Sequence, residues 1–180
     1  GIRDDDSKTR YMNILLGYQE WQEDVTITNG FQEICNLPCR SGTGPIAGLN
    51  SRYNFNWKSL LVGFEGATTI YKNFSLEGIA IFIPYTEYTG EGIWNLRTDF
   101  RKDPSFRHRA NGGYGLQLDA SIIYRISEVF EVDLGYRYWY MKSGVGTDTT
   151  YFSSGAVVTT QFNEAVSKRE GGFLGLSYIF

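Results

Sequence analysis

Hydrophobic and polar residues alternate along much of the chain, and the alternation is clearest over residues 128–141. One face of this stretch is apolar and aromatic, with Phe130, Val132, Leu134, Tyr136, Tyr138 and Tyr140. The other face carries Glu131, Asp133, Gly135, Arg137 and Trp139. Glu170–Phe180 alternates in the same way, with Leu174, Leu176, Tyr178 and Phe180 on one face. A period of two predicts β-strands, not helices.

A wide aromatic face opposite a face with charges of both signs suits a barrel that has lipid outside and a polar lumen. The chain also ends on Phe180, after alternating hydrophobic residues. This ending resembles the C-terminal signature of Gram-negative outer-membrane β-barrels. The resemblance implies a location in the bacterial outer membrane, in contact with its lipid and lipopolysaccharide.

The same alternation divides the chain into about eight strands joined by short turns and long loops. The expected strands are Arg10–Val25, Pro45–Asn56, Ser59–Tyr71, Ser75–Ile83, Thr86–Arg97, Gly113–Ile126, Val129–Lys142 and a last strand that ends at Phe180. Tight turns are expected at Trp57-Lys58, Pro84-Tyr85 and Ser127-Glu128, and long loops at Thr26–Gly44, Thr98–Asn111 and Ser143–Glu164. The strand count within residues 73–98 is left open.

Long loops at one rim and short turns at the other are typical of outer-membrane barrels. We therefore predict an all-β fold, an antiparallel up-and-down transmembrane β-barrel of about eight strands. It would form a single domain over residues 1–180, with residues 1–9 as an N-terminal periplasmic segment.

Composition agrees with this fold and excludes other classes. Aromatic residues make up 16% of the 180 residues, and there are 21 glycines. The net charge of −3 argues against a nucleic-acid partner. No apolar run approaches the ~20 residues of a membrane helix, so a membrane crossing would have to use strands.

Charged residues on the inward faces predict a network inside the barrel. Its expected members are Arg52, Glu65, Asp119, Arg125, Glu131, Asp133 and Arg137. Unpaired charges inside the barrel would be costly, so we expect them to pair with one another. Since side chains fill the bore of an eight-stranded barrel, we favour a structural network over a proton or ion path, and a narrow pore remains an alternative.

Cys35 and Cys39 lie together in a polar loop. In an oxidising compartment they are expected to form a local disulfide. A metal pair is the other interpretation, but no His or further Cys is nearby. We expect neither a metal nor a cofactor.

His108 is the single histidine and limits the possible chemistry. The run His108–Asn111 resembles the His-x-Ser-Asn run of the lipid A deacylase family, but Ala110 stands where that family has its nucleophilic serine. The aromatic run Tyr136–Tyr140 and the late long loop resemble the omptin proteases, which use an Asp–His pair and a second Asp pair. No Asp precedes His108 at the omptin spacing. We therefore expect His108 to be a solvated loop residue and the protein not to be an enzyme, with an omptin-like or deacylase-like hydrolase as the alternative.

Basic residues gather in and beside the loop at 98–111. Arg101, Lys102, Arg107 and Arg109 could bind lipopolysaccharide phosphates through charge-assisted hydrogen bonds. The simpler interpretation is a solvated charged loop. The sequence thus predicts an integral outer-membrane protein with a structural role or a surface binding role through its loops. It identifies no protein partner or oligomeric state.

Overall fold

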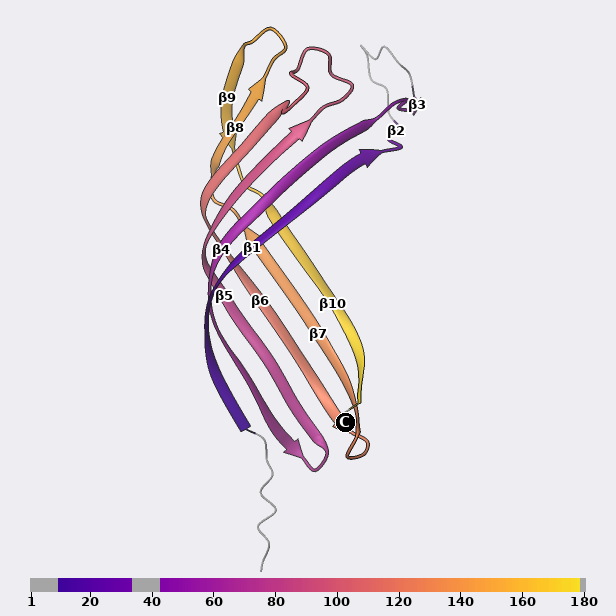
Figure 1. Cartoon of the computed structure of the whole chain (residues 1–180), viewed down its shortest axis with the longest axis vertical. Helices are drawn as coiled ribbons and strands as arrows, with labels where there is room; N and C mark the ends of the chain where they lie inside the picture. The colour runs from indigo at the N-terminus through magenta and orange to yellow at the C-terminus, as the bar shows by residue number, and fades with distance from the viewer. Residues whose placement is uncertain (1–9, 34–42, 179–180) are drawn as a thin grey trace, which may run out of the picture.

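The computed structural model describes residues 10–33 and 43–178, and these residues form one curled antiparallel sheet (Figure 1). Six long strands build its wall: β1 (Arg10–Thr28), β4 (Asn50–Tyr71), β5 (Phe74–Ile93), β6 (Phe106–Arg125), β7 (Phe130–Lys142) and β10 (Val166–Tyr178). Four short strands lie at one end: β2 (Phe31–Gln32), β3 (Gly44–Pro45), β8 (Gly146–Tyr151) and β9 (Val157–Phe162). The described residues contain no helix that is long and apolar enough to cross a membrane.

The wall has the predicted up-and-down topology, because its order β1-β4-β5-β6-β7-β10 follows the chain. The β4–β5 and β6–β7 turns lie at the lower end in Figure 1, and the three long connections lie at the upper end. The upper part of β6 pairs with β8, which pairs in turn with β9. The sheet therefore has eight strands, as expected, but the β8–β9 hairpin supplies two of them.

Two predicted turns do not exist. Residues 57–58 lie inside β4, which pairs with β1 without interruption from Asn50 to Thr68. Pro84 and Tyr85 lie inside β5, where the pairing registers shift between Ile83 and Thr86. Proline lacks the N–H of a ladder residue, and a bulge accommodates it without ending the strand.

This bulge changes which residues of β5 face inward. Below it, Ile81 and Ile83 point to the concave side; above it, Thr86 and Tyr88 do, so the inward positions change from odd to even. A matching irregularity near Gly112, at φ +79°, changes β6 in the same way. In β4 the odd positions face inward throughout, because that strand has no such break near its centre.

The lower half of the outer surface is apolar and is bounded by two aromatic belts. Tyr18, Tyr114 and Tyr140 mark the upper belt, and Tyr71, Phe74, Tyr124, Phe130 and Tyr178 mark the lower one. Ten residues separate Tyr114 from Tyr124 along β6. At about 3.3 Å per residue and a tilt of about 40°, they cover a height of about 25 Å, which is that of a membrane-spanning apolar band.

The apolar residues that alternate along β1, β6 and β7 point outward in this band, as expected for the face of residues 128–141. Met12, Ile14 and Leu16 are 70–80% exposed, and Leu134 is 63% exposed. The strands continue well above the band, since β4 has 22 residues and a tilted strand needs only about 9–11 to cross. There the outer surface is polar, with Asn56 donating to Glu20 (2.7 Å) and Arg107 paired with Glu91 (2.5 Å). The upper half therefore stands outside the membrane.

The sheet curls until its two edge strands approach each other. Arg169 of β10 forms an ion pair with Glu23 of β1, and its guanidinium lies 4.2 Å above the ring of Trp21. Deeper inside, Gln117 Nε2 of β6 donates to Gln19 Oε1 of β1 at 2.8 Å. Within the described residues no backbone ladder joins β1 to β10. The described sheet is therefore not a closed eight-stranded ring. The expectation of a blocked lumen rested on the narrow bore of such a ring.

Candidate functional site

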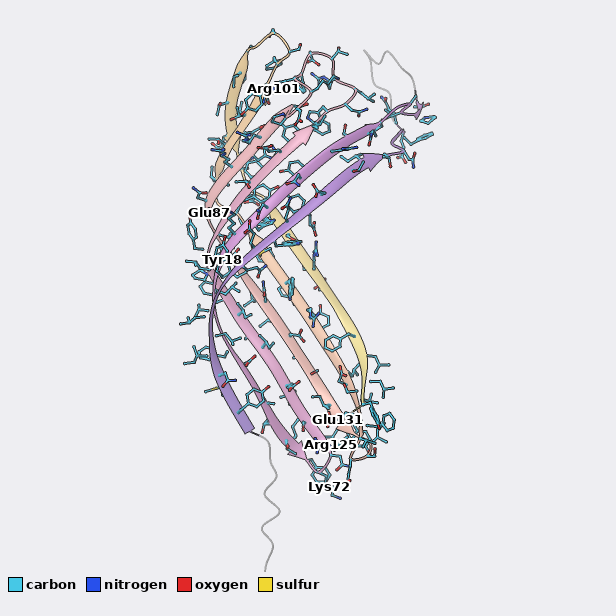
Figure 2. The ribbon with its side chains drawn as sticks, in the orientation of Figure 1. Tyr18, Lys72, Glu87, Arg101, Arg125 and Glu131 are labelled. Carbon is cyan, nitrogen blue, oxygen red and sulfur yellow. The ribbon has the colours of Figure 1, made fainter. Side chains whose placement is uncertain are left out.

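The lower half of the concave face holds a polar cavity of about 480 Å³ at membrane depth, hereafter the lower cavity. Its charged lining consists of Glu65, Glu77, Asp119, Glu131, Asp133 and Arg137. Arg137 Nε donates to Asp119 Oδ2 at 2.6 Å, and Arg125 Nε donates to Glu131 Oε1 at 2.8 Å. Figure 2 shows Arg125 and Glu131 together near the lower end. These pairs join β6 to β7 across the sheet.

Neutral groups bind two further carboxylates of the lower cavity. Asn13 Nδ2 donates to Glu65 Oε1 at 3.0 Å, and the Tyr11 hydroxyl donates to Glu77 Oε1 at 3.5 Å. The structure thus brings together six of the seven residues that the sequence predicted as a network. Arg52 lies elsewhere, on the outward positions of β4, because that strand continues without the predicted turn. The arrangement holds neighbouring strands together.

Buried residues fill the waist above the lower cavity. Trp57, Ile83, Tyr88, Ala110 and Met141 are each at most 4% exposed, and Leu61 and Ile81 pack against them. Ser59 Oγ donates to Thr86 Oγ1 (2.9 Å) within this layer. The layer separates the lower cavity from a second cavity above it.

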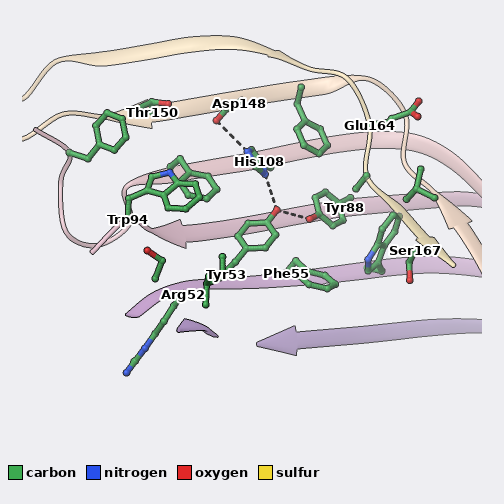
Figure 3. Close-up of a pocket in the computed structure, with 18 residues that line it drawn as sticks. Arg52, Tyr53, Phe55, Tyr88, Trp94, His108, Asp148, Thr150, Glu164 and Ser167 are labelled. Atoms are coloured by element: carbon green, nitrogen blue, oxygen red, sulfur yellow. Dashed lines mark hydrogen bonds and ion pairs between the residues drawn. The ribbon is translucent and has the colours of Figure 1, made fainter. Parts of the chain in front are cut away.

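This second cavity, hereafter the upper cavity, has a volume of about 640 Å³ and lies in the half outside the membrane (Figure 3). Aromatic rings dominate its lining: Tyr53, Phe55, Trp57, Tyr88, Trp94, Phe100, Phe106 and Phe162. Three of them come from alternate positions of β4, which places them on one face. The alternation of the expected strand Pro45–Asn56 would place Tyr53 and Phe55 on a lipid-facing side, but the unbroken register of β4 turns its odd positions inward.

A chain of polar contacts crosses the upper cavity. The Tyr53 hydroxyl lies 2.5 Å from that of Tyr88 and 2.8 Å from His108 Nδ1. His108 Nε2 lies 3.5 Å from Asp148 Oδ1. The prediction of a solvated loop histidine is therefore wrong: His108 is in β6, with its side chain 18% exposed and its ring stacked 4.5 Å from Phe162.

Glycines in β5 make room for this arrangement. A Cβ at Gly90 would collide with the Tyr53 hydroxyl, and one at Gly92 would collide with the Phe106 ring. The two inward rings can thus lie directly across the neighbouring strand. A side chain at either position would displace a wall of the upper cavity.

Burial determines the protonation of the central groups. It lowers the pKa of His108, an effect that the nearby Asp148 carboxylate only partly opposes. Burial, together with the Tyr88 hydrogen bond, raises the pKa of Tyr53. At neutral pH the imidazole is therefore uncharged, with Nδ1 beside the Tyr53 hydroxyl and Nε2 beside the Asp148 carboxylate.

Two buried polar atoms of the upper cavity have no hydrogen-bond partner among the described residues. They are Asp148 Oδ1, an acceptor, and Trp57 Nε1, a donor. Trp57 is 1% exposed, so water does not reach it freely. A buried polar group without a partner is costly, and native proteins rarely keep one without a reason. Within the described ranges no group of three His, Cys, Asp or Glu side chains is placed to hold a metal ion.

The remaining predicted residues lie away from both cavities or outside the described residues. Arg101 and Lys102 are in the β5–β6 connection, where Arg101 Nε donates to the Pro104 carbonyl (3.3 Å) and Lys102 Nζ to that of Asn95 (3.0 Å). Arg107 and Arg109 are on outward positions of β6, not in a loop, because that strand begins at Phe106. The disulfide of Cys35 and Cys39 falls outside the described residues and stays a prediction.

Sequence reasoning missed the upper cavity, although one signal pointed to it. Aromatic residues alternate from Tyr53 to Trp57 beyond the length of strand that a membrane needs. Asp148 gave no such signal, since 40 residues separate it from His108 and only the β6–β8 register makes them opposite partners.

Comparisons with known proteins agree with this architecture. A family model described as Pom, Protochlamydia outer membrane protein, matches residues 10–180. The crystal structure of the outer membrane protease OmpT from Escherichia coli is similar in fold, with a TM-score of 0.67 and 14% identity. The alignment covers 95% of this chain and 58% of that one, so the chain spans little more than half the length of OmpT. No curated protein sequence matches the chain.

Proposed function

Because the chain belongs to the Protochlamydia outer membrane protein family and has the fold of an outer-membrane β-barrel, we propose that it is a membrane-anchored binding protein whose ligand enters the upper cavity. The apolar band fixes the lower half in the membrane. The upper half then presents the cavity on the side of the long connections, which is the outer side in barrels of this kind.

The observation that carries this proposal is the composition of the upper cavity. A space of about 640 Å³ falls within the range of small-molecule sites. Such sites combine a mostly apolar and aromatic lining with a few polar groups that orient the ligand. Here Trp57 Nε1 and Asp148 Oδ1 are polar groups with bonding capacity to spare.

Calorimetric titration of the purified protein in octyl glucoside with 4-methylphenol tests the proposal. We expect saturable binding that disappears in Thr150→Trp, because Thr150 lines the upper cavity and an indole there would fill it. Thr149→Trp is the matched control, since Thr149 is the preceding residue of β8 and faces the other side. Binding that survives Thr150→Trp, or no saturable binding at all, would contradict the proposal.

A second candidate function is peptide hydrolysis, which the Asp148–His108 contact and the OmpT-like fold favour. Two features weigh against it. Protein groups lie at both imidazole nitrogens, so neither is free to take a proton from a substrate or water. The other carboxylate of the upper cavity, Glu164, is held by Lys142 at 2.7 Å and does not form a pair of acids with Asp148.

The two candidates are separated by incubating the purified protein with a fluorogenic peptide library. Under the binding proposal we expect no turnover above that of a heat-inactivated sample. Turnover that His108→Ala abolishes would establish the hydrolase instead.

Binding of lipopolysaccharide at the basic residues is a further, independent proposal. Arg101 and Lys102 already donate to backbone carbonyls, and Arg107 is paired with Glu91. Arg109 is exposed on the outer surface. Phosphate binding would therefore require most of these groups to exchange partners, which lowers the expected affinity.

A further inference from the structure

The Asp148 carboxylate places uncompensated negative charge at the wall of the upper cavity. Its Oδ1 atom is buried without a hydrogen-bond partner among the described residues, and His108 Nε2 lies 3.5 Å from it. Since burial keeps His108 neutral, that neighbour supplies a dipole but no positive charge. A carboxylate in this position would gain from a cationic group in the cavity.

Among residues 10–33 and 43–178, no Lys or Arg side chain forms an ion pair with Asp148. Lys142 is bound to Glu164. The guanidinium of Arg52 points away from the His108 cluster, as Figure 3 shows. Arg52 thus lines the upper cavity without reaching Asp148, and the cation that pairs with this carboxylate would have to come from the ligand.

Aromatic rings line the same cavity as Asp148 and pack around its neighbour His108. His108 stacks on Phe162 at 4.5 Å, Phe106 lies 5.0 Å from His108, and the Tyr88 and Phe162 rings are parallel at 5.7 Å. Ring faces attract cations, and cages of several rings recognise ammonium groups in particular. The aromatic lining and the carboxylate therefore favour the same kind of ligand.

The buried Trp57 indole adds a requirement for an acceptor. Its Nε1–H lacks a partner among the described residues, and the residue lines the same cavity. A ligand oxygen at this point would satisfy the donor. A hydroxyl or carbonyl group on the ligand would supply it.

From these three features, and resting on the binding function proposed above, we infer that the ligand of the upper cavity is a small organic ammonium compound that also carries an oxygen acceptor. The ammonium group pairs with Asp148 and contacts the ring faces. The oxygen accepts the hydrogen bond from Trp57 Nε1. No covalent step is involved.

The test compares choline with 3,3-dimethylbutan-1-ol, a neutral molecule of the same shape that keeps the hydroxyl group. Tryptophan fluorescence reports binding, because Trp57 and Trp94 line the upper cavity. The protein is kept in octyl glucoside, since phosphocholine detergents would present the same cation. We expect choline to bind about tenfold more tightly than the alcohol.

Two variants separate the contributions. Asp148→Asn keeps the shape of the side chain but removes its charge, and should abolish most of the preference for choline. Trp57→Phe removes the N–H and should weaken binding of choline and the alcohol by similar factors. Glu91→Gln is the control for a change of charge alone, because Glu91 is paired with Arg107 on the outer surface. Folding of each variant is checked by its circular dichroism spectrum.

Each outcome decides the inference. Equal affinity for both compounds, or a preference for choline that survives Asp148→Asn in a folded protein, would overturn it. Absence of choline binding while 4-methylphenol still binds would overturn the cationic ligand but leave the binding function standing. Loss of both probes would remove the proposed function together with the inference.

Discussion

Placing an arginine on the lipid-facing or the cavity-facing side of the wall tests the assignment of its two faces. Leu134 lies between the two aromatic belts, points outward and is 63% exposed. Leu134→Arg would place a guanidinium near the middle of the bilayer, at a cost of about 2–4 kcal/mol. Since each 1.4 kcal/mol corresponds to a factor of ten, the folding equilibrium should fall by about thirty- to several-hundredfold.

The control places the same side chain at the same depth on the other face. Ser121 of β6 is opposite Gly135, the residue after Leu134, and lines the lower cavity. There an arginine meets an excess of carboxylates, so Ser121→Arg should change the folding free energy by only about 1 kcal/mol or less. Gly135 itself is unsuitable as a control, because any Cβ there would collide with the Phe173 ring and come within 2.8 Å of the Ala120 carbonyl.

Both variants are measured by urea titration in phospholipid vesicles, with tryptophan fluorescence reporting the folded fraction. The reasoning predicts a shifted midpoint for Leu134→Arg alone. Equal losses for the two variants would contradict this assignment of the faces of β7 and β6. A larger loss for Ser121→Arg would indicate that the outward and inward faces are exchanged.

Three further predictions concern the network, the histidine and the cysteines. Arg137→Ala should lower the thermal midpoint slightly, by an amount that corresponds to about 1 kcal/mol of unfolding free energy. The reason is that it leaves the Asp119 carboxylate without its partner at 2.6 Å. An unchanged midpoint would show that the pair contributes nothing to stability. Because burial lowers the pKa of His108, the unfolded chain binds the proton more tightly, so stability should be full above about pH 6.5 and decline as the pH falls below it. His108→Gln should reduce this decline in urea titrations between pH 5 and pH 8 (about the range over which histidine titrates), and an unaltered pH profile would exclude the mechanism. Mass spectrometry of the unreduced protein should find neither Cys35 nor Cys39 alkylated, whereas two reactive thiols would exclude the disulfide.

The sequence predicted the membrane-spanning half of the wall well, for a physical reason. In β7 the alternation from Phe130 to Tyr140 is unbroken, and lipid on one side with a charged cavity on the other makes the two faces chemically different. β7 therefore begins within one residue of its expected start and ends where expected, at Lys142. The turn at Ser127-Glu128 was predictable because polar residues follow directly after the apolar run.

The upper half was predicted poorly because alternation cannot tell lipid from a cavity. Tyr53 and Phe55 form an aromatic face of the kind that a membrane strand turns outward, yet here it lines a cavity. The two environments can be distinguished only by following the alternation from the lower half of β4 into its upper half. The turn predicted at Trp57-Lys58 interrupted that alternation. The contact between His108 and Asp148 depends on how the β8–β9 hairpin pairs with β6, which one sequence does not reveal.

The bulge at Pro84 affects which insertions and deletions in the sequence this fold can accept. In the β5–β6 hairpin, different alternate positions face inward in the two halves: odd residue numbers in the half within the membrane, and even residue numbers in the half above it. A deletion of one residue just above Pro84 would expose Thr86 and Tyr88, now at most 4% exposed, and turn Glu87 inward. Insertions or exchanged segments in these strands should thus be tolerated when their boundaries lie at the bulge, because the alternation of inward and outward positions already shifts there. The upper cavity can in this way diversify as a unit while the membrane-spanning wall below it stays the same.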